Sequence, residues 1–382
     1  MIVRPAGEVD RRRLLEGGTA VLAASLGFAA RPAFCATGSE ETNKLPGPSS
    51  GPEPAIDPDL PIIDAHHHLY DDVGSERAPF KRYLLPEFLS DIATGGHRIT
   101  HTVFVQHSRS AMYRSDGPEA LRPVGETEFA NGIGAIGASG RYGSTRVAAA
   151  LVAWADLRLG SEVRRVLEAH VAAGNGRTRG VRFQNAWADA SIYGNSPGDR
   201  SQALIFRDPK VREAVAQLAP LGLSLDSWCF HPQIGELTSL ASAFPGTTFV
   251  LNHLGTPLRL GSYRDKPREA FIEWRQLLRD LALRPNVFVK LGGLGMVLDA
   301  PKGSVPKNLG SDVLEKAWGP YIETAVEIFG AQRCMFESNF PNDGATCSYG
   351  VLWNTFKRIA RQYSLEERTA LFSGSAAKVY RL

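Results

Sequence analysis

Two histidines, His66 and His68, lie two positions apart at the end of a short apolar run that begins at Pro61. Alternate side chains of a strand share one face, so Asp64, His66 and His68 are predicted to point the same way and His67 the opposite way. Two imidazoles on one inward face can ligate one metal ion or polarise one substrate carbonyl. Because a lone His-x-His pattern is weak evidence, its meaning depends on the element that carries it.

A third histidine, His253, follows the apolar run Thr248–Leu251 and Asn252. The Leu254-Gly255 pair after it favours a sharp turn, which would leave His253 at the end of a strand. The alternative is a buried histidine whose ring is satisfied by a backbone partner. We expect His253 to act together with the two earlier histidines.

Short apolar runs rich in β-branched residues recur from residue 61 onward. Most are continuous rather than alternating, as expected for strands buried on both faces of a parallel sheet. The eight runs are Pro61–Asp64, Thr102–Val105, Val147–Trp154, Gly180–Phe183, Leu223–Trp228, Thr248–Leu251, Val287–Leu291 and Cys334–Phe336.

Stretches with helical periodicity separate these runs. They are the stretch starting at Ser161-Glu162, Pro209–Leu218, Ile234–Phe244, Arg268–Leu283, Val313–Phe329 and Leu352–Tyr363. This alternation predicts βαβ units, and eight units in about 320 residues fit an α/β fold of the (β/α)8 TIM-barrel type. A doubly wound open sheet is the alternative, but it would usually carry a Gly-rich turn after its first strand, where this chain has histidines.

Polar side chains follow every predicted strand. In a barrel the C-terminal ends of all the strands converge on one face, and that face carries the catalytic residues. The polar groups at these ends are Asp64–His68, Gln106-His107, Asp156, Arg182 with Gln184, Asp226 with His231, Asn252-His253, Lys290 and Glu337–Asn339.

Some of these strand-end residues are predicted to contact the substrate: Gln106, Arg182, Trp228 and Lys290. The cations suit a small molecule that carries a carboxylate, because an arginine can bind a carboxylate through two parallel hydrogen bonds. The alternative is that they form salt bridges with Glu337 or Asp156.

The segment Ile63–Tyr70 resembles the first-strand motif of the amidohydrolase superfamily, and residues 61–382 resemble its amidohydrolase-2 branch. That branch contains sugar-acid lactonases, 2-pyrone-4,6-dicarboxylate lactonase and aminocarboxymuconate-semialdehyde decarboxylase. Further similar stretches are Pro123–Phe129, Val152–Leu157, Gly180–Arg182, Phe249–Gly255, Val287–Leu291 and the tail Gly374–Tyr380. The resemblance implies a TIM barrel, hydrolysis or non-oxidative decarboxylation, and functional roles for His66, His68 and His253.

The end of strand eight departs from the family pattern. The family usually has Gly-Ser-Asp there, whereas this chain has Glu337-Ser338-Asn339. An amide takes up no proton near neutral pH, so Asn339 cannot be a general base. We expect Glu337 to act as base or metal ligand and Asn339 to orient water or substrate. The alternatives are His231 as the base, or a structural ion pair of Glu337 with Lys290 or Arg182.

The leading interpretation is a hydrolase that opens a lactone or related cyclic ester by attack of water on a carbonyl. His66, His68 and His253 would polarise that carbonyl, with one divalent metal ion (zinc or manganese) or without a metal. Two alternatives stay open: a decarboxylase of an unsaturated or aromatic carboxylic acid, and a non-catalytic binding protein built on a barrel.

Composition excludes several other classes of protein. The 43 Lys+Arg are nearly balanced by 40 Asp+Glu, so a basic nucleic-acid binder is not expected. Outside the N-terminus there is no apolar run of about 18 residues, so no membrane span is expected. Nothing in the sequence fixes the number of subunits, and an oligomer is compatible with it.

The N-terminus resembles an export signal. Arg11-Arg12-Arg13 precede Leu14-Leu15 and the apolar stretch Ala20–Ala30, as in a twin-arginine signal. We therefore predict a signal over residues 1–36, a flexible linker over residues 37–60 and a periplasmic barrel over residues 61–382. A retained amphipathic N-terminus is the alternative.

The long Gly-rich segment Ser108–Arg146 is interpreted as a lid over the mouth of the barrel.

Overall fold

The computed structural model describes residues 53–71, 82–107, 110, 112–188, 204–259, 261–296 and 309–382. The predicted signal over residues 1–36 and residues 37–52 of the predicted linker lie outside this part of the chain. Export and the periplasmic location therefore stay predictions.

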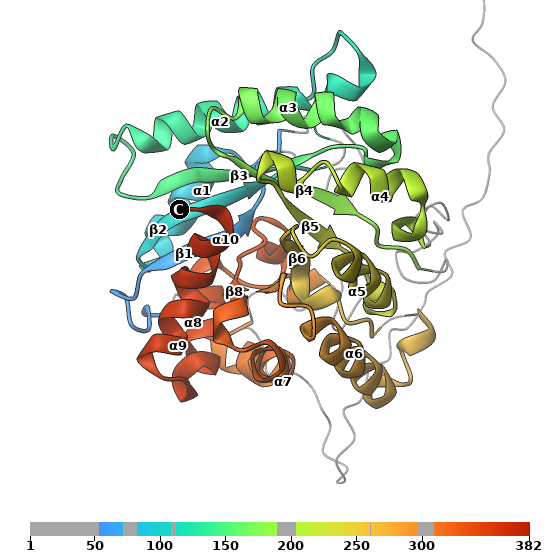
Figure 1. Ribbon diagram of the computed structural model, residues 1–382. Coiled ribbons are helices and arrows are strands. Elements are labelled where there is room, and N and C mark those ends of the chain that lie inside the picture. Colours follow the sequence, from blue (N-terminus) through green and yellow to red (C-terminus); the bar gives the residue numbers. More distant parts are fainter. Residues whose placement is uncertain are drawn as a thin grey trace, which may run out of the picture. The chain divides into compact units, whose positions relative to one another are not determined.

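Eight parallel strands follow one another around a nearly closed barrel in the order of the chain (Figure 1). They are β1 (Ile62–His67), β2 (Ile99–Val105), β3 (Arg146–Trp154), β4 (Thr178–Gln184), β5 (Ser224–Trp228), β6 (Phe249–Leu251), β7 (Val287–Leu291) and β8 (Cys334–Phe336). Each predicted run overlaps one of these strands, so the predicted (β/α)8 TIM barrel is confirmed.

The residues that follow β8 bridge the space between β8 and β1. The backbone N–H of Asn339 donates to the carbonyl of His66 at 2.8 Å, and the N–H of His68 donates to the carbonyl of Phe340 at 2.8 Å. This pairing brings the departing end of strand eight beside the His-x-His segment.

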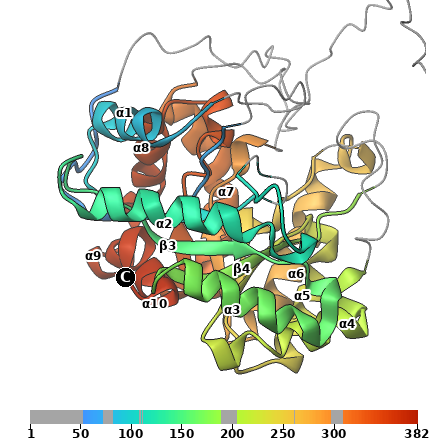
Figure 2. The same cartoon turned by 90° about the horizontal axis from the view of Figure 1, so that it is seen from above.

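Helices surround the strands (Figures 1 and 2). They are α1 (Leu85–Gly95), α2 (Val124–Ala138), α3 (Val163–Ala173), α4 (Pro209–Val215), α5 (Ile234–Ala243), α6 (Pro267–Ala282), α7 (Ser311–Phe329), α8 (Tyr349–Ile359), α9 (Leu365–Thr369) and α10 (Ser375–Tyr380). The six predicted helices are confirmed, whereas α1, α2, α9 and α10 were not predicted as helices. No helix in the described ranges is both long enough and apolar enough to cross a bilayer.

Helix α2 occupies much of the segment predicted to be a lid. Figure 2 shows α2 lying along β3, as a barrel helix does. A Cβ on Gly134 would lie 2.8 Å from the carbonyl oxygen of Ala148, and one on Gly137 would lie 3.0 Å from the backbone nitrogen of Val147. The lid interpretation is therefore wrong for residues 124–138, because these glycines let the helix approach the strand closely.

A one-residue bulge in β1 corrects the predicted side-chain faces. Three steps along β1, from Asp64 to His67, match two steps along β2, so the alternation shifts by one residue. Asp64 therefore points away from His66 and accepts hydrogen bonds from the backbone of Ser338 and the hydroxyl of Tyr349. His67 points the opposite way from His66, as predicted, and stacks on α1.

Helix α10 fills the barrel from the end where the strands begin. Its Ala376, Val379 and Tyr380 belong to one buried apolar cluster with inward-facing residues of β1, β2, β3, β6, β7 and β8. At the start of β4, Arg179 donates to the carbonyl oxygen of Tyr380 at 2.9 Å. The C-terminus therefore forms part of the barrel core.

The described end of the predicted linker is held against the barrel. The backbone N–H of Ser311 donates to Glu53 at 2.7 Å, and the N–H of Ile56 donates to Asn354 at 2.8 Å. Contact with the barrel therefore begins before the predicted boundary at residue 61.

Two glycines of α2 provide a matched test of the close helix–strand contact. Gly134→Ala should lower the free energy of unfolding by about 1–3 kcal/mol, because its Cβ meets β3 backbone. Gly132→Ala, where no atom lies within 4 Å, should raise it by about 0.5–1 kcal/mol. Urea denaturation measures both. Equal effects of the two substitutions would contradict the packing role.

Candidate active site

The first two predicted histidines lie together inside the barrel. The Nε2 atoms of His66 and His68 are 3.1 Å apart, and both side chains are buried. Nδ1 of His68 lies 2.7 Å from the carbonyl oxygen of Val105, so this nitrogen carries a proton and donates it. Nε2 of His68 is then an acceptor, and His66 supplies the proton between the two rings.

Glu337 joins the third predicted histidine to the first. Its Oε1 accepts hydrogen bonds from the backbone N–H of His253 at 3.1 Å and from Nδ1 of the same residue at 2.7 Å. Its Oε2 lies 2.9 Å from Nδ1 of His66 but has no hydrogen-bond partner among the described residues. Glu337 is therefore anchored through one oxygen, while the other remains an open acceptor.

A glycine pair after β7 makes room for these two side chains. A Cβ on Gly292 would lie 2.5 Å from Cγ of Glu337, and one on Gly293 would lie 2.4 Å from the ring of His253. His253 itself adopts a left-handed backbone conformation, with φ of 54°, which turns its N–H toward Glu337. This pair was not among the predicted site residues, although two consecutive glycines directly after a buried strand are a signal that the sequence carries.

Lys290 pairs with Asp226 rather than with Glu337. Nζ of Lys290 donates to Oδ2 of Asp226 at 2.7 Å, and both side chains are fully buried. Nδ2 of Asn252 donates to the same oxygen at 3.0 Å. The structural ion pair that was considered between Glu337 and Lys290 is therefore absent from the described residues.

Arg182 is a buried cation with unused hydrogen-bond donors. Its Nε and Nη1 have no hydrogen-bond partner within the described ranges, and its guanidinium lies 5.5 Å from the ring centre of Trp228. Trp228 uses its own N–H on the hydroxyl of Thr256 at 3.0 Å. Buried N–H groups without partners are costly, so this guanidinium is suited to bind an anionic group.

The surroundings of the three histidines favour the neutral form of each ring. Burial is the first cause that lowers the pKa of His66, His68 and His253. The positive charge of Arg182 lowers the pKa of all three further, and that of Lys290 lowers the pKa of His66 and His253. Glu337 partly offsets these effects at His253, because a carboxylate favours the protonated ring.

Asn339 is tied to a carboxyl group that the sequence analysis did not single out. Nδ2 of Asn339 donates to Oδ1 of Asp343 at 3.0 Å, and Asn339 has a left-handed φ of 51°. Asp343 is fully buried, and its Oδ2 has no partner in the described structure. Burial raises the pKa of Asp343 to about 8, so it is a neutral acid at pH 7. The only sign of Asp343 in the sequence was its position four residues after Asn339.

Gln106 forms hydrogen bonds with backbone groups, which leaves its amide no role in binding a substrate. Its Nε2 donates to the carbonyl of Pro123 at 2.7 Å, and its Oε1 accepts from the backbone N–H of Trp154 at 2.8 Å. The amide joins the ends of β2 and β3 to the start of α2. The predicted substrate contact is therefore replaced by a structural role.

His231 lies against the loop that precedes α6. Its Nδ1 accepts from the backbone N–H of Leu258 at 3.0 Å, and its ring packs on Tyr263 with centroids 4.7 Å apart. Burial lowers its pKa to about 4. Within the described ranges it forms no hydrogen bond or ring contact with Glu337 or the other histidines, so it is not placed to be the base of the site.

A compact set of ligand atoms fits a divalent cation. His66, His253 and Glu337 each offer one such atom, and these atoms lie within 4.8 Å of one another. Imidazole nitrogens with one carboxylate suit zinc, and manganese accepts such ligands too. The open Oε2 of Glu337 is consistent with a cation at this point. Of the predicted ligands, His68 falls outside this set.

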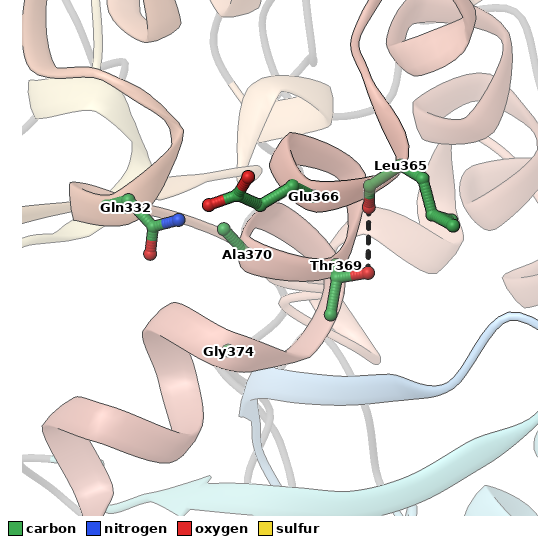
Figure 3. Close-up of a pocket in the computed structure, with 6 residues that line it drawn as sticks. All are labelled: Gln332, Leu365, Glu366, Thr369, Ala370 and Gly374. Carbon is green, nitrogen blue, oxygen red and sulfur yellow. Dashed lines mark hydrogen bonds between the residues drawn. The ribbon is translucent and has the colours of Figure 1, made fainter.

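A separate surface depression does not unite any of the predicted residues. It has a volume of about 590 Å³ and lies beside α9 (Figure 3). The residues that line it are Gln332, Leu365, Glu366, Thr369, Ala370 and Gly374. With one carboxylate and no histidine, it offers no comparable chemistry.

A model of the amidohydrolase family matches residues 63–382. The Sinorhizobium fredii protein y4mH is 32% identical over 342 residues, which cover 85% of this chain and 99% of that protein. An L-fucono-1,5-lactonase of Burkholderia multivorans is 29% identical over 280 residues, covering 69% of this chain and 86% of the lactonase.

Solved structures show the same architecture. A Burkholderia multivorans amidohydrolase crystallised with HEPES is 25% identical with a TM-score of 0.62, and the match covers 84% of this chain and 99% of that one. A second crystal form of a Burkholderia multivorans amidohydrolase, 24% identical with a TM-score of 0.62 and the same coverage, contains bound zinc.

Asp343 should make stability depend on pH in a way that Asp343→Asn removes. Its pKa of about 8 lies above the ordinary value of 3.8, so between these values the folded protein keeps a proton that the unfolded chain has lost. Stability of the wild type therefore falls as pH rises through this window, by up to about 1.4 kcal/mol per pH unit. Urea denaturation at several pH values should show that the free energy of unfolding of Asp343→Asn rises relative to that of the wild type as the pH increases to about 8. A difference that does not change with pH would contradict the buried neutral acid.

Proposed function

The chain belongs to the amidohydrolase family and is a hydrolase, and from this premise we propose that it opens a lactone or related cyclic ester of a carboxylate-bearing small molecule. The observation that carries the proposal is the pairing of two open groups in one buried site. Oε2 of Glu337 can accept a proton, and the guanidinium of Arg182 can bind an anion. The L-fucono-1,5-lactonase among the relatives supports a lactone as the substrate class.

The hydrogen bonds of the three histidines limit what they can do for a carbonyl. His66 donates its proton to His68, His68 donates to Val105, and His253 donates to Glu337. None of the three rings then has a spare N–H for a substrate oxygen. This revises the expectation that the histidines alone polarise the carbonyl.

A divalent metal ion, held by His66, His253 and Glu337, would supply Lewis-acid polarisation of the carbonyl when bound. In our proposal Oε2 of Glu337, when it is not bound to a metal ion, takes the proton of the attacking water. Nε2 of His253 is buried and has no partner in the described part of the chain, so it replaces His231 as the second candidate acceptor. Arg182 orients the substrate through its carboxylate.

Glu337→Gln tests the proposed base. Glutamine keeps the shape of the side chain and an oxygen for the bond from His253, but its amide accepts no proton. We expect kcat/KM for a hydrolysed lactone to fall by about 10²- to 10⁴-fold. A panel that includes L-fucono-1,5-lactone, followed by acid release, measures this, with metal content determined on the same preparations.

Glu236→Gln is the matched control for this experiment. Glu236 is a buried glutamate of α5 whose Oε2 accepts from the backbone N–H of Phe206. Its substitution should leave turnover unchanged. Glu337→Gln with wild-type turnover would refute the base assignment, and a wild type that releases CO₂ without opening any lactone would favour the decarboxylase alternative.

Arg182→Met tests the substrate class. Loss of the guanidinium should raise KM for a carboxylate-bearing lactone by about 10- to 100-fold, because charge-assisted hydrogen bonds are lost. A neutral lactone of similar size should be affected much less. Arg182→Lys, which keeps the charge without the two-pronged donor, should lie between. Equal effects of Arg182→Met on the KM of both lactones would show that Arg182 does not bind the substrate carboxylate.

A further inference from the structure

The turn that follows β6 is strained. Its residues His253, Leu254, Gly255 and Thr256 all adopt left-handed backbone conformations, with φ of 54°, 57°, 68° and 44°. A β-branched residue such as threonine rarely adopts this conformation, whereas glycine or asparagine does so at lower cost. Strained residues persist only where their surroundings hold them in place, and they cluster at functional sites. The proposed hydrolysis uses His253 from this turn but gives Thr256 no role.

The side chain of Thr256 holds the indole of Trp228. Nε1 of Trp228 donates to Oγ1 of Thr256 at 3.0 Å, and Thr256 is buried. Because an indole has one hydrogen-bond donor and no acceptor, this contact fixes the direction in which the N–H edge of the ring points. The backbone N–H of Thr256 donates to the carbonyl oxygen of His253 at 2.7 Å, which ties the residue to its own turn.

The indole of Trp228 in turn packs against Arg182. The guanidinium carbon lies 5.5 Å from the ring centre, within the range of a cation–π contact. The two side chains come from neighbouring strands, because β4 and β5 are paired along their length. Nε and Nη1 of Arg182 have no hydrogen-bond partner in the part of the chain that the structure describes. The face of the indole therefore helps to set where these open N–H groups point.

We propose that Thr256 is a positioning residue for the substrate carboxylate: its hydroxyl orients Trp228, and the indole holds the guanidinium of Arg182 with its open N–H groups toward the substrate. The effect on substrate binding rests on the proposed function, whereas the effect of Thr256 on Arg182 does not. One turn then positions a group for each end of the substrate, His253 at the carbonyl and Thr256, through its two partners, at the carboxylate.

The competing explanation is that Thr256 only stabilises the turn. Thr256→Val separates the two roles, because valine is also β-branched and loses only the oxygen that accepts from Trp228. A turn that changed shape would disturb His253 as well, so kcat would fall and every substrate would be affected. Loss of the positioning role would affect only the binding of a carboxylate.

The first experiment measures how KM depends on the substrate. For Thr256→Val we expect KM for a carboxylate-bearing lactone to rise by about three- to tenfold with kcat within about twofold, since one hydrogen bond is lost. KM for a neutral lactone of similar size should not change. Thr256→Ser keeps the hydroxyl and should restore the wild-type KM. Trp228→Phe lacks the indole N–H, so Thr256→Val should have no further effect in that background.

Thr145→Val is the matched control. Thr145 lies just before β3 and donates its hydroxyl to the carbonyl oxygen of Ile99 at 2.7 Å, so the same group is lost at the end of the barrel where the strands begin. This variant should change neither kcat nor KM.

The second experiment tests the contact with Arg182 without any substrate. In ¹⁵N-arginine spectra, the Nε–H signal of Arg182 is the one that disappears in Arg182→Met, and the ring current of a neighbouring indole shifts it. Thr256→Val and Trp228→Phe should both move this signal. Thr256→Ser and Thr145→Val should leave it in place.

An unmoved Arg182 signal in folded Thr256→Val would overturn the proposal, and so would equal rises in KM for the two lactones. Thr256→Gly is the second variant if Thr256→Val does not fold: glycine suits the left-handed conformation and also lacks the hydroxyl, so it should move the same signal. If the wild type opens no lactone, the proposed function fails, and the arginine spectra still decide the positioning role.

Discussion

The buried ion pair between Lys290 and Asp226 is the interaction on which the rest of the site depends. Both charges lie inside the barrel, where desolvation is costly unless each is fully hydrogen-bonded. Asn252 and Tyr380 supply the remaining donors to Asp226. Removal of one member of such a pair typically costs about 3–5 kcal/mol, because the other charge is left uncompensated. Burial lowers the pKa of His66 and His253, and the positive charge of Lys290 in this pair lowers both values further.

Two other buried charged groups, Arg182 and Glu337, differ from this ion pair because part of their hydrogen-bonding capacity is unused. Among the residues that the structure describes, Arg182 has N–H groups without partners, and Glu337 has one oxygen without a donor. Buried polar atoms are normally hydrogen-bonded, so the unused atoms of Arg182 and Glu337 point to a substrate, a water molecule or a cation as the missing partner. Strain and close contacts make this arrangement possible. The left-handed His253 and the glycine pair Gly292-Gly293 bring its ring against Glu337.

The sequence predicted the barrel well because buried parallel strands leave a strong signal. Continuous apolar runs separated by amphipathic stretches placed all eight strands. The rule that strand C-termini converge brought His66, His68, His253, Arg182 and Glu337 into one region. It does not show which partner a polar side chain finds, so Gln106 and His231 were assigned to the site although their hydrogen bonds go to backbone groups of neighbouring elements.

Other errors came from local irregularity and from distance along the chain. The bulge in β1 reversed the face of Asp64, and no sequence period records one inserted residue. Asp343 and Tyr380 were missed because their partners are set by tertiary packing. Tyr380 meets Asp226 across 154 positions, which composition and spacing do not reveal. Glu337 was noticed because it departs from a known pattern, but only the structure shows that one of its oxygens anchors His253.

The central claim is that water attacks a carbonyl at this site. The most direct measurement is turnover of a hydrolysed lactone in ¹⁸O-labelled water, with mass spectrometry of the product and of any gas released. One labelled oxygen should enter the new carboxylate in each turnover, and no CO₂ should form. A product that loses CO₂ and carries no label would contradict it.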